Sequence, residues 1–154
     1  MNREAAVNFD QMVDELQHEI AAREKALYSD IVLREASAPK NMGCLDDAHL
    51  RGMVRGWCGD TMEIYLRLHD GHIQRATFVT DGCGATVACG SLLTQMVTGM
   101  KLERAEWILP KDLVNALGGL PEESMHCAGL AISTLHNALF SWRMSRMEDA
   151  EEVD

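Results

Sequence analysis

The sequence predicts an α+β domain, because a helical segment is followed by a pair of strands and then by a cluster of helical segments. The clearest strand is 62–68, where apolar and polar residues alternate as a sheet with one buried face requires. Asp70-Gly71 then predicts a tight hairpin turn, and 73–80 returns as the partner strand. Small and apolar residues predict a helix over 85–98, which Gly99 closes.

The remaining segments divide the chain into three parts. Short helices are expected over 102–108 and 111–117, and a last helix begins near Met125, whereas the glycine-containing stretch 36–61 reads mainly as loop. The acidic residues from Glu148 onward predict a disordered tail. We therefore expect the following organisation: a helical extension over 1–27, one domain over 28–146 and an acidic tail over 147–154.

The N-terminal helical extension has an amphipathic pattern without Gly or Pro over 3–27. Its apolar residues recur at steps of three and four, as on one face of a helix: Phe9, Met12, Val13, Leu16 and Ile20. Two interpretations remain open. The favoured one is a helix that packs on its own domain, and the other is a helix that forms a homodimer.

Composition limits the classes of function. A chain of 154 residues with 47% hydrophobic content suits one domain with a substantial core. A net charge of −10 argues against nucleic acid or an anionic membrane surface as a partner, and favours a basic one. No apolar run has the length of a signal peptide core or a membrane span, so we expect a soluble, unprocessed cytoplasmic protein. None of the five cysteines forms a Cys-x-x-Cys pair, which favours reduced thiols.

Three cysteines, Cys58, Cys83 and Cys127, stand in glycine-rich or polar breaks beside apolar segments. A single free cysteine is usually a small core residue. Three in such breaks, with Asp60 two positions after the first and His126 directly before the last, favour a site for a soft metal or for sulfur chemistry.

The chemistry of this donor set follows from its positions. Cys83 and Cys127 are expected at helix N-termini, which stabilise the thiolate, although burial opposes this effect. Three thiolates with Asp60 or His126 complete four-coordination of a [2Fe-2S] cluster or a zinc ion. Asp60 could instead be an ordinary turn residue, and His126 a solvated one. Outside the set, Cys89 should face the core, and Cys44 is either a reactive surface thiol or a buried one.

These residues also carry a family resemblance. The stretch from Tyr28 to about Arg146 resembles the scaffold proteins of iron-sulfur cluster assembly, the IscU type that also forms the N-terminal part of NifU. The matching motifs occur in the family's order: Tyr28-Ser29-Asp30, Pro39-Lys40-Asn41-Met42-Gly43, Cys58-Gly59-Asp60-Thr61-Met62, Gly82-Cys83-Gly84-Ala85 and His126-Cys127.

The resemblance implies a small three-stranded antiparallel sheet with helices on one face and the cysteine loops meeting at one end. It implies a scaffold rather than a turnover enzyme. Sulfur would arrive as persulfide from a pyridoxal-phosphate cysteine desulfurase, with Cys127 as the first acceptor, and a [2Fe-2S] cluster would pass to apo iron-sulfur proteins. The alternative is a zinc-binding sulfur-relay or regulatory module with the same ligands and no cluster.

One segment departs from the family. Bacterial members often carry Leu-Pro-Pro-Val-Lys before the third motif, where their dedicated Hsp70-type chaperone binds, and this chain has Leu120-Pro121-Glu122-Glu123-Ser124. The lysine is lost and two acids are gained. We therefore do not expect the chaperone interaction, and the site loses a nearby positive charge.

Overall fold

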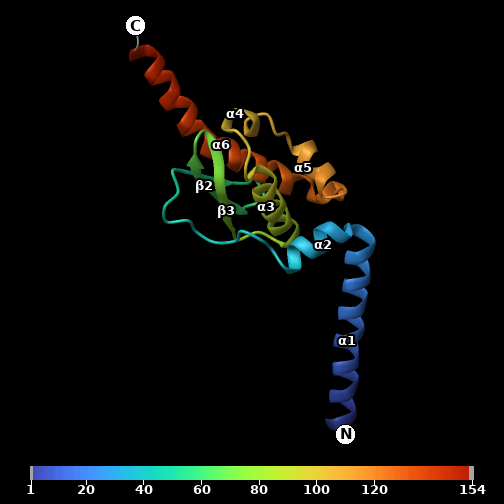
Figure 1. The fold of residues 1–154 in the computed structure, drawn as a ribbon. Helices are drawn as coiled ribbons and strands as arrows, with labels where there is room; N and C mark the ends of the chain where they lie inside the picture. Colours follow the sequence, from blue (N-terminus) through green and yellow to red (C-terminus); the bar gives the residue numbers. More distant parts are fainter. Residues whose placement is uncertain (1, 153–154) are drawn as a thin grey trace.

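A three-stranded antiparallel sheet forms the centre of the fold in the computed structural model, which describes residues 2–152, with side chains over 8–149 (Figure 1). The strand order is β1-β2-β3, with β1 at Leu50–Arg55, β2 at Thr61–His69 and β3 at His72–Thr80. Helices both precede and follow the sheet in sequence, so the predicted α+β class and the three-stranded antiparallel sheet are confirmed. The helices are α1 (Asn2–Leu27), α2 (Asp30–Ser37), α3 (Gly84–Val97), α4 (Leu102–Ala105), α5 (Pro110–Ala116) and α6 (Met125–Glu152).

The predicted hairpin joins β2 to β3. Asp70 and Gly71 have φ values of 57° and 74°, and positive φ at both central residues is the geometry of a type I′ turn. The turn fixes the register of the two strands, and β2 then directs Met62, Ile64 and Leu66 into the core, where all three are fully buried.

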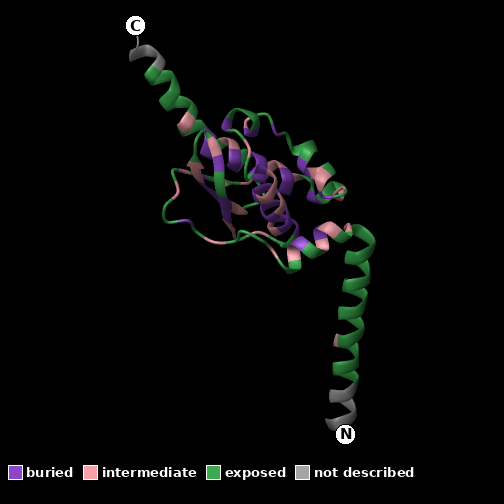
Figure 2. Ribbon diagram, in the orientation of Figure 1, coloured by how far each residue is buried: buried purple, intermediate pink, exposed green. Residues whose placement is uncertain are grey.

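Helices α3 and α6 pack on the sheet, and the buried residues lie between these layers (Figures 1 and 2). Two glycines allow the close approach. A Cβ atom at Gly90 in α3 would lie 2.4 Å from the Phe78 ring of β3, and one at Gly52 in β1 would lie 2.5 Å from the backbone nitrogen of Ala138 in α6. Any side chain at either position would therefore push a helix away from the sheet.

Several local predictions need correction. The stretch 36–61 is less loop-like than expected, because it contains β1. The helix predicted over 102–108 ends at Ala105, and the tail predicted to be disordered continues α6 through Glu152, while 153–154 lie outside the described residues. Good helix formers without Gly or Pro explain the longer helix. α2 was missed, although Ser29 is a recognisable N-cap whose side chain accepts a hydrogen bond from the Val32 N–H at 3.1 Å.

The N-terminal segment is helical as predicted, but it does not pack on its own domain. α1 extends away from the rest of the structure, and its described side chains are almost all exposed (Figures 1 and 2). The favoured interpretation of its apolar pattern is therefore wrong, because these side chains find no core in the described chain. Within that part of the chain, no helix is long and apolar enough to cross a membrane.

Candidate functional site

Two of the predicted thiols lie at the start of the two helices that cover the sheet. Cys83 is the N-cap residue of α3, and Cys127 is the third residue of α6. The hydroxyl of Thr86, one turn into α3, lies between them: its Oγ1 donates a hydrogen bond to Cys127 Sγ at 3.3 Å and is 3.6 Å from Cys83 Sγ. The structure thus brings Cys83 and Cys127 to opposite sides of one hydroxyl group.

The two thiols differ in exposure and acidity. Cys127 is 1% exposed, and burial raises its pKa to about 11. Cys83 is exposed, and its pKa is lowered: burial of part of the side chain raises it, but hydrogen bonds from the Thr86 and Ala85 N–H groups and from the Thr86 hydroxyl outweigh that effect. The helix N-terminus therefore favours the thiolate at Cys83 as predicted, whereas burial overrides it at Cys127.

The Thr86 hydroxyl carries one proton, so it can donate to only one sulfur at a time. In the structure it donates to Cys127. If Cys83 ionises, the same proton can turn to that sulfur. This arrangement supports one thiolate more readily than two, since two ionised sulfurs would also repel each other.

The third thiol, Cys58, is exposed on the loop between β1 and β2. The loop is closed by hydrogen bonds from the Gly56 N–H to the Asp60 carbonyl at 2.7 Å and from the Gly59 N–H to the Gly56 carbonyl at 2.9 Å. Gly59 has a φ of +96°, which favours glycine, and the space around its missing Cβ is open.

This loop meets the start of α6 through an aromatic contact. The ring centroids of Trp57 and His126 are 5.4 Å apart, and His126 Nε2 is 3.7 Å from Cys127 Sγ. Asp60 is half-buried at the loop's end. The described residues nevertheless include no group of three or more Cys, His, Asp or Glu side chains already arranged to hold a metal ion.

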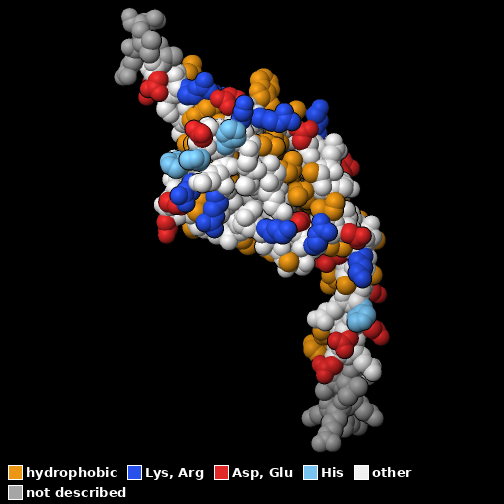
Figure 3. Space-filling view, in the orientation of Figure 1, with side chains coloured by type: hydrophobic (Ala, Val, Ile, Leu, Met, Phe, Trp, Pro, Cys, Tyr) orange, Lys and Arg blue, Asp and Glu red, His pale blue; other side chains and the backbone are white. Residues whose placement is uncertain are grey.

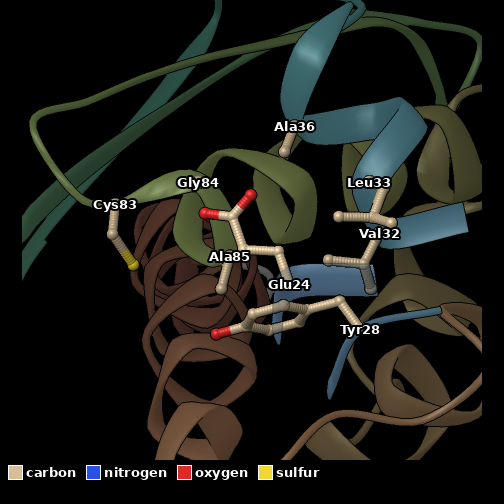
Figure 4. Close-up of a pocket in the computed structure, with 8 residues that line it drawn as sticks. All are labelled: Glu24, Tyr28, Val32, Leu33, Ala36, Cys83, Gly84 and Ala85. Carbon is tan, nitrogen blue, oxygen red and sulfur yellow. The ribbon is translucent and has the colours of Figure 1, made fainter. Parts of the chain in front are cut away.

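A cavity of about 200 Å³ opens beside Cys83 (Figure 4). Its walls come from the end of α1, from α2 and from the start of α3, and they are mainly apolar, with the Tyr28 ring on one side and the Cys83 side chain at one edge. The lining residues are Glu24, Tyr28, Val32, Leu33, Ala36, Cys83, Gly84 and Ala85.

The segment that departs from the family is ordered by contacts of its own. Glu122–Ser124 form a 3-10 turn before α6, with Glu122 and Glu123 exposed and Ser124 buried. The Ser124 hydroxyl is hydrogen-bonded to the Tyr28 hydroxyl at 2.8 Å. Ser124 therefore joins this segment to Tyr28, which lies between α1 and α2.

The other two cysteines lie outside this group. Cys89 is fully buried in the core, as expected from its place on α3. Cys44 is exposed, which settles the two alternatives in favour of a surface thiol, and it lies beside Tyr65, whose pKa is raised by hydrogen bonding first with Glu63 and then with Cys44.

Sequence reasoning missed two contributors to the site. Thr86 could have been found from its position three residues after an N-cap cysteine, where a side chain can reach the cap. Trp57 gave a weaker signal, namely a large aromatic residue within a glycine-flanked polar break, and it is 87% exposed.

The fold and the site together define the class of this protein. It is an α+β domain that holds two cysteines at helix N-termini and a third on a glycine-containing loop. The chain belongs to the family described as NifU-like N terminal domain, whose model matches residues 27–149. It is 38% identical over 117 residues to the iron-sulfur cluster assembly scaffold protein IscU 1 of Archaeoglobus fulgidus, covering 75% of this chain and 76% of the relative.

Two further comparisons agree with this assignment. The iron-sulfur cluster assembly scaffold protein IscU of Escherichia coli is 34% identical over 124 residues, which cover 77% of this chain and 96% of that protein. The crystal structure of the N-terminal part of a nitrogen-fixing NifU-like protein from Brucella abortus superimposes with a TM-score of 0.58 at 18% identity, covering 73% of this chain and 92% of that one. That similarity shows the shared fold.

Proposed function

We propose that this protein is a scaffold on which iron and sulfide are assembled into a [2Fe-2S] cluster that is then transferred to apo iron-sulfur proteins. The observation that carries the proposal is the pairing of Cys83 and Cys127 across the Thr86 hydroxyl in a chain of the NifU-like family. Relatives that share 34% to 38% identity are named as scaffold proteins of iron-sulfur cluster assembly.

The donor set suits this cargo. Thiolate sulfur is the ligand that iron-sulfur clusters prefer, and Cys58, Cys83 and Cys127 supply three, with Asp60 or His126 as the fourth ligand. A site with one oxygen or nitrogen ligand should hold its cluster less tightly than four thiolates would. Weak retention suits a protein whose cargo must leave.

We propose that the Cys58 loop adjusts when this cargo binds. The described side chains are not prearranged as a metal site, Cys58 is exposed, and its loop has open space around Gly59. A small change in the positive-φ backbone at Gly59 would redirect Cys58 and Asp60 together. The Trp57 and His126 contact connects this motion to the start of α6.

Sulfur would arrive from a pyridoxal-phosphate cysteine desulfurase, with Cys127 as the first acceptor. In that step the Cys127 thiolate attacks the outer sulfur of the desulfurase persulfide, a new S–S bond forms on Cys127, and the desulfurase cysteine leaves as a thiolate. The proton of Cys127 must first leave a sulfur that is 1% exposed. Cys83 is the competing acceptor because it is exposed and its pKa is lowered.

Anaerobic reconstitution with ferrous iron, cysteine, a cysteine desulfurase and a dithiol reductant, which reduces the persulfide sulfur to sulfide, tests the function. We expect absorption bands of a [2Fe-2S] cluster with two irons and two sulfides per cluster, and loss of these bands in Cys58→Ser. Cys44→Ser is the matched control, since it changes an exposed thiol outside the site. Stoichiometric zinc without any cluster under these conditions would instead support the zinc-binding module.

The route of sulfur is tested separately by mapping persulfide with mass spectrometry after a short incubation with the desulfurase and cysteine. The proposal expects the label on Cys127. Label on Cys83 alone would make Cys83 the acceptor, and label confined to Cys44 or Cys89 would refute delivery to this site. The five free cysteines are consistent with the reducing cytoplasm that we propose as its location.

A further inference from the structure

The apolar stripe of α1 is uncovered in the described chain. Phe9 is 65% exposed, Leu16 and Ile20 are each 54% exposed, and Leu27 is 53% exposed. Apolar and acidic side chains both lie on the surface of this helix (Figure 3). Because most of the stability of a helix in a protein comes from packing of its apolar face, a partner that covers the stripe would stabilise α1.

The spacing of the stripe indicates what covers it. From Phe9 the seam positions follow steps of four, three, four, three and four, which is a seven-residue repeat: Phe9, Val13, Leu16, Ile20, Arg23 and Leu27. A strict seven-residue repeat has a period of 3.5 and keeps a narrow seam against another helix in a left-handed supercoil. A helix that packs on a globular surface would show a broader apolar face.

The residue types favour a particular partner. In heptad terms Val13 and Ile20 occupy a positions and Leu16 occupies a d position. β-branched residues at a with leucine at d favour two parallel strands. We propose that α1 pairs with α1 of a second copy of this chain in a parallel, in-register coiled coil, which makes the protein a homodimer.

Arg23 offsets the acidic residues beside the seam in a pair of identical helices. In a parallel pair, Glu19 at g lies across from Glu24 at e of the second copy, and these like charges repel. Arg23, at the d position between them, places a guanidinium from each chain among these carboxylates. In this pair Arg23 also faces Arg23 of the second copy, and the carboxylates of Glu19 and Glu24 from both chains offset the repulsion between the two guanidinium groups.

The pair of g and e positions one heptad earlier adds no electrostatic repulsion to the dimer. Met12 at g lies across from Gln17 at e of the second copy, and both are uncharged. The seam is therefore apolar from Phe9 to Ile20, and ionic near Arg23. A single charged seam position costs stability but fixes register, because sliding one helix by a heptad would place Arg23 against an apolar layer.

Sedimentation equilibrium of the full chain tests the proposal. We expect a mass of twice 17.1 kDa at micromolar concentration. Ile20→Glu, in the seam, should weaken association at least about tenfold, whereas Ala21→Glu, on the outer face, should leave it unchanged. Arg23→Glu should likewise weaken association, and Lys25→Glu, the same charge reversal at an outer position, should have a much smaller effect.

Orientation and folding are checked on the same variants. Val13→Cys should form an interchain disulfide that joins position 13 of both chains under mild oxidation, as only a parallel in-register pair allows. Cooperative thermal unfolding of Ile20→Glu near the parent temperature would show that the domain stays folded. Three results would each overturn the proposal. The parent could be monomeric even at about 100 μM, a concentration at which a weak dimer would form. The dimer could be insensitive to Ile20→Glu, or the disulfide between the two chains at position 13 could be absent.

Discussion

Replacing Thr86 with valine should raise the pKa of Cys83. Valine keeps nearly the same shape in a position that is fully buried, but it removes the hydroxyl that contacts both Cys83 and Cys127. The backbone N–H groups of Ala85 and Thr86 remain, so Cys83 keeps part of its stabilisation. The substitution therefore isolates the contribution of one hydroxyl proton.

The magnitude follows from the strength of a hydrogen bond to an ionised group, which is about 1.5–3 kcal/mol in proteins. Cys83 is exposed, so water replaces part of the lost interaction, and the lower end of that range applies. Since one pKa unit corresponds to about 1.4 kcal/mol, the pKa of Cys83 should rise by roughly one unit. Loss of the bond to Cys127 should also lower the free energy of unfolding by about 1 kcal/mol.

The pKa is measured from the pH dependence of iodoacetamide alkylation at Cys83, followed on its own peptide by mass spectrometry. Thr134→Val is the matched control, because Thr134 is equally buried but donates to the Leu130 carbonyl at 2.7 Å rather than to a sulfur. An alkylation midpoint that is the same in Thr86→Val and the parent would refute the role assigned to this hydroxyl.

Three more predictions follow from the site. If the Asp60 carboxylate promotes release, Asp60→Ala should slow the transfer of the reconstituted cluster to an apo-acceptor or to a chelator. Equal transfer rates for Asp60→Ala and the parent would count against this role of Asp60. Burial raises the pKa of Cys127 from 9.0 to about 11. The protonated thiol therefore contributes to the free energy of unfolding below pH 9, and this contribution is lost as the pH rises to 11. Urea unfolding should show that the free energy of unfolding falls more steeply over this range in the parent than in Cys127→Ser. A peptide spanning residues 119–125 should not bind the dedicated Hsp70-type chaperone in a fluorescence anisotropy titration, because Glu122 and Glu123 are exposed carboxylates in place of a basic segment; low-micromolar binding would contradict this.

Local sequence patterns predicted those helices and strands whose conformation depends mainly on their own residues. The hairpin was predictable because Asp70-Gly71 suits positive φ angles and the residues on either side alternate. β1 was hidden in a glycine-containing stretch, since Gly52 is required there by the backbone of α6 rather than by the strand itself. Such tertiary requirements leave no periodic signal in the strand's own sequence.

The candidate site was predictable to a similar extent. The positions of Cys83 and Cys127 at helix N-termini follow from local patterns, and both are confirmed. The relative acidity of the two thiols was not predictable, because it depends on how deeply each helix start is packed. The exposure of the α1 stripe was also beyond sequence reasoning, since the tertiary fold decides whether the domain offers a surface that covers it.

Under the proposed function, sulfur transfer to Cys127 and binding of the cargo both depend on the contact between the Cys58 loop and the start of α6. Cys127 is buried beside His126, whose ring contacts Trp57 on the loop that carries Cys58. A displacement of this loop would change the contact with His126 and the position of Cys58 together. Because Trp57 is 87% exposed, a protein that binds this ring could shift the loop, and delivery of sulfur would then be coupled to the arrival of the delivering protein.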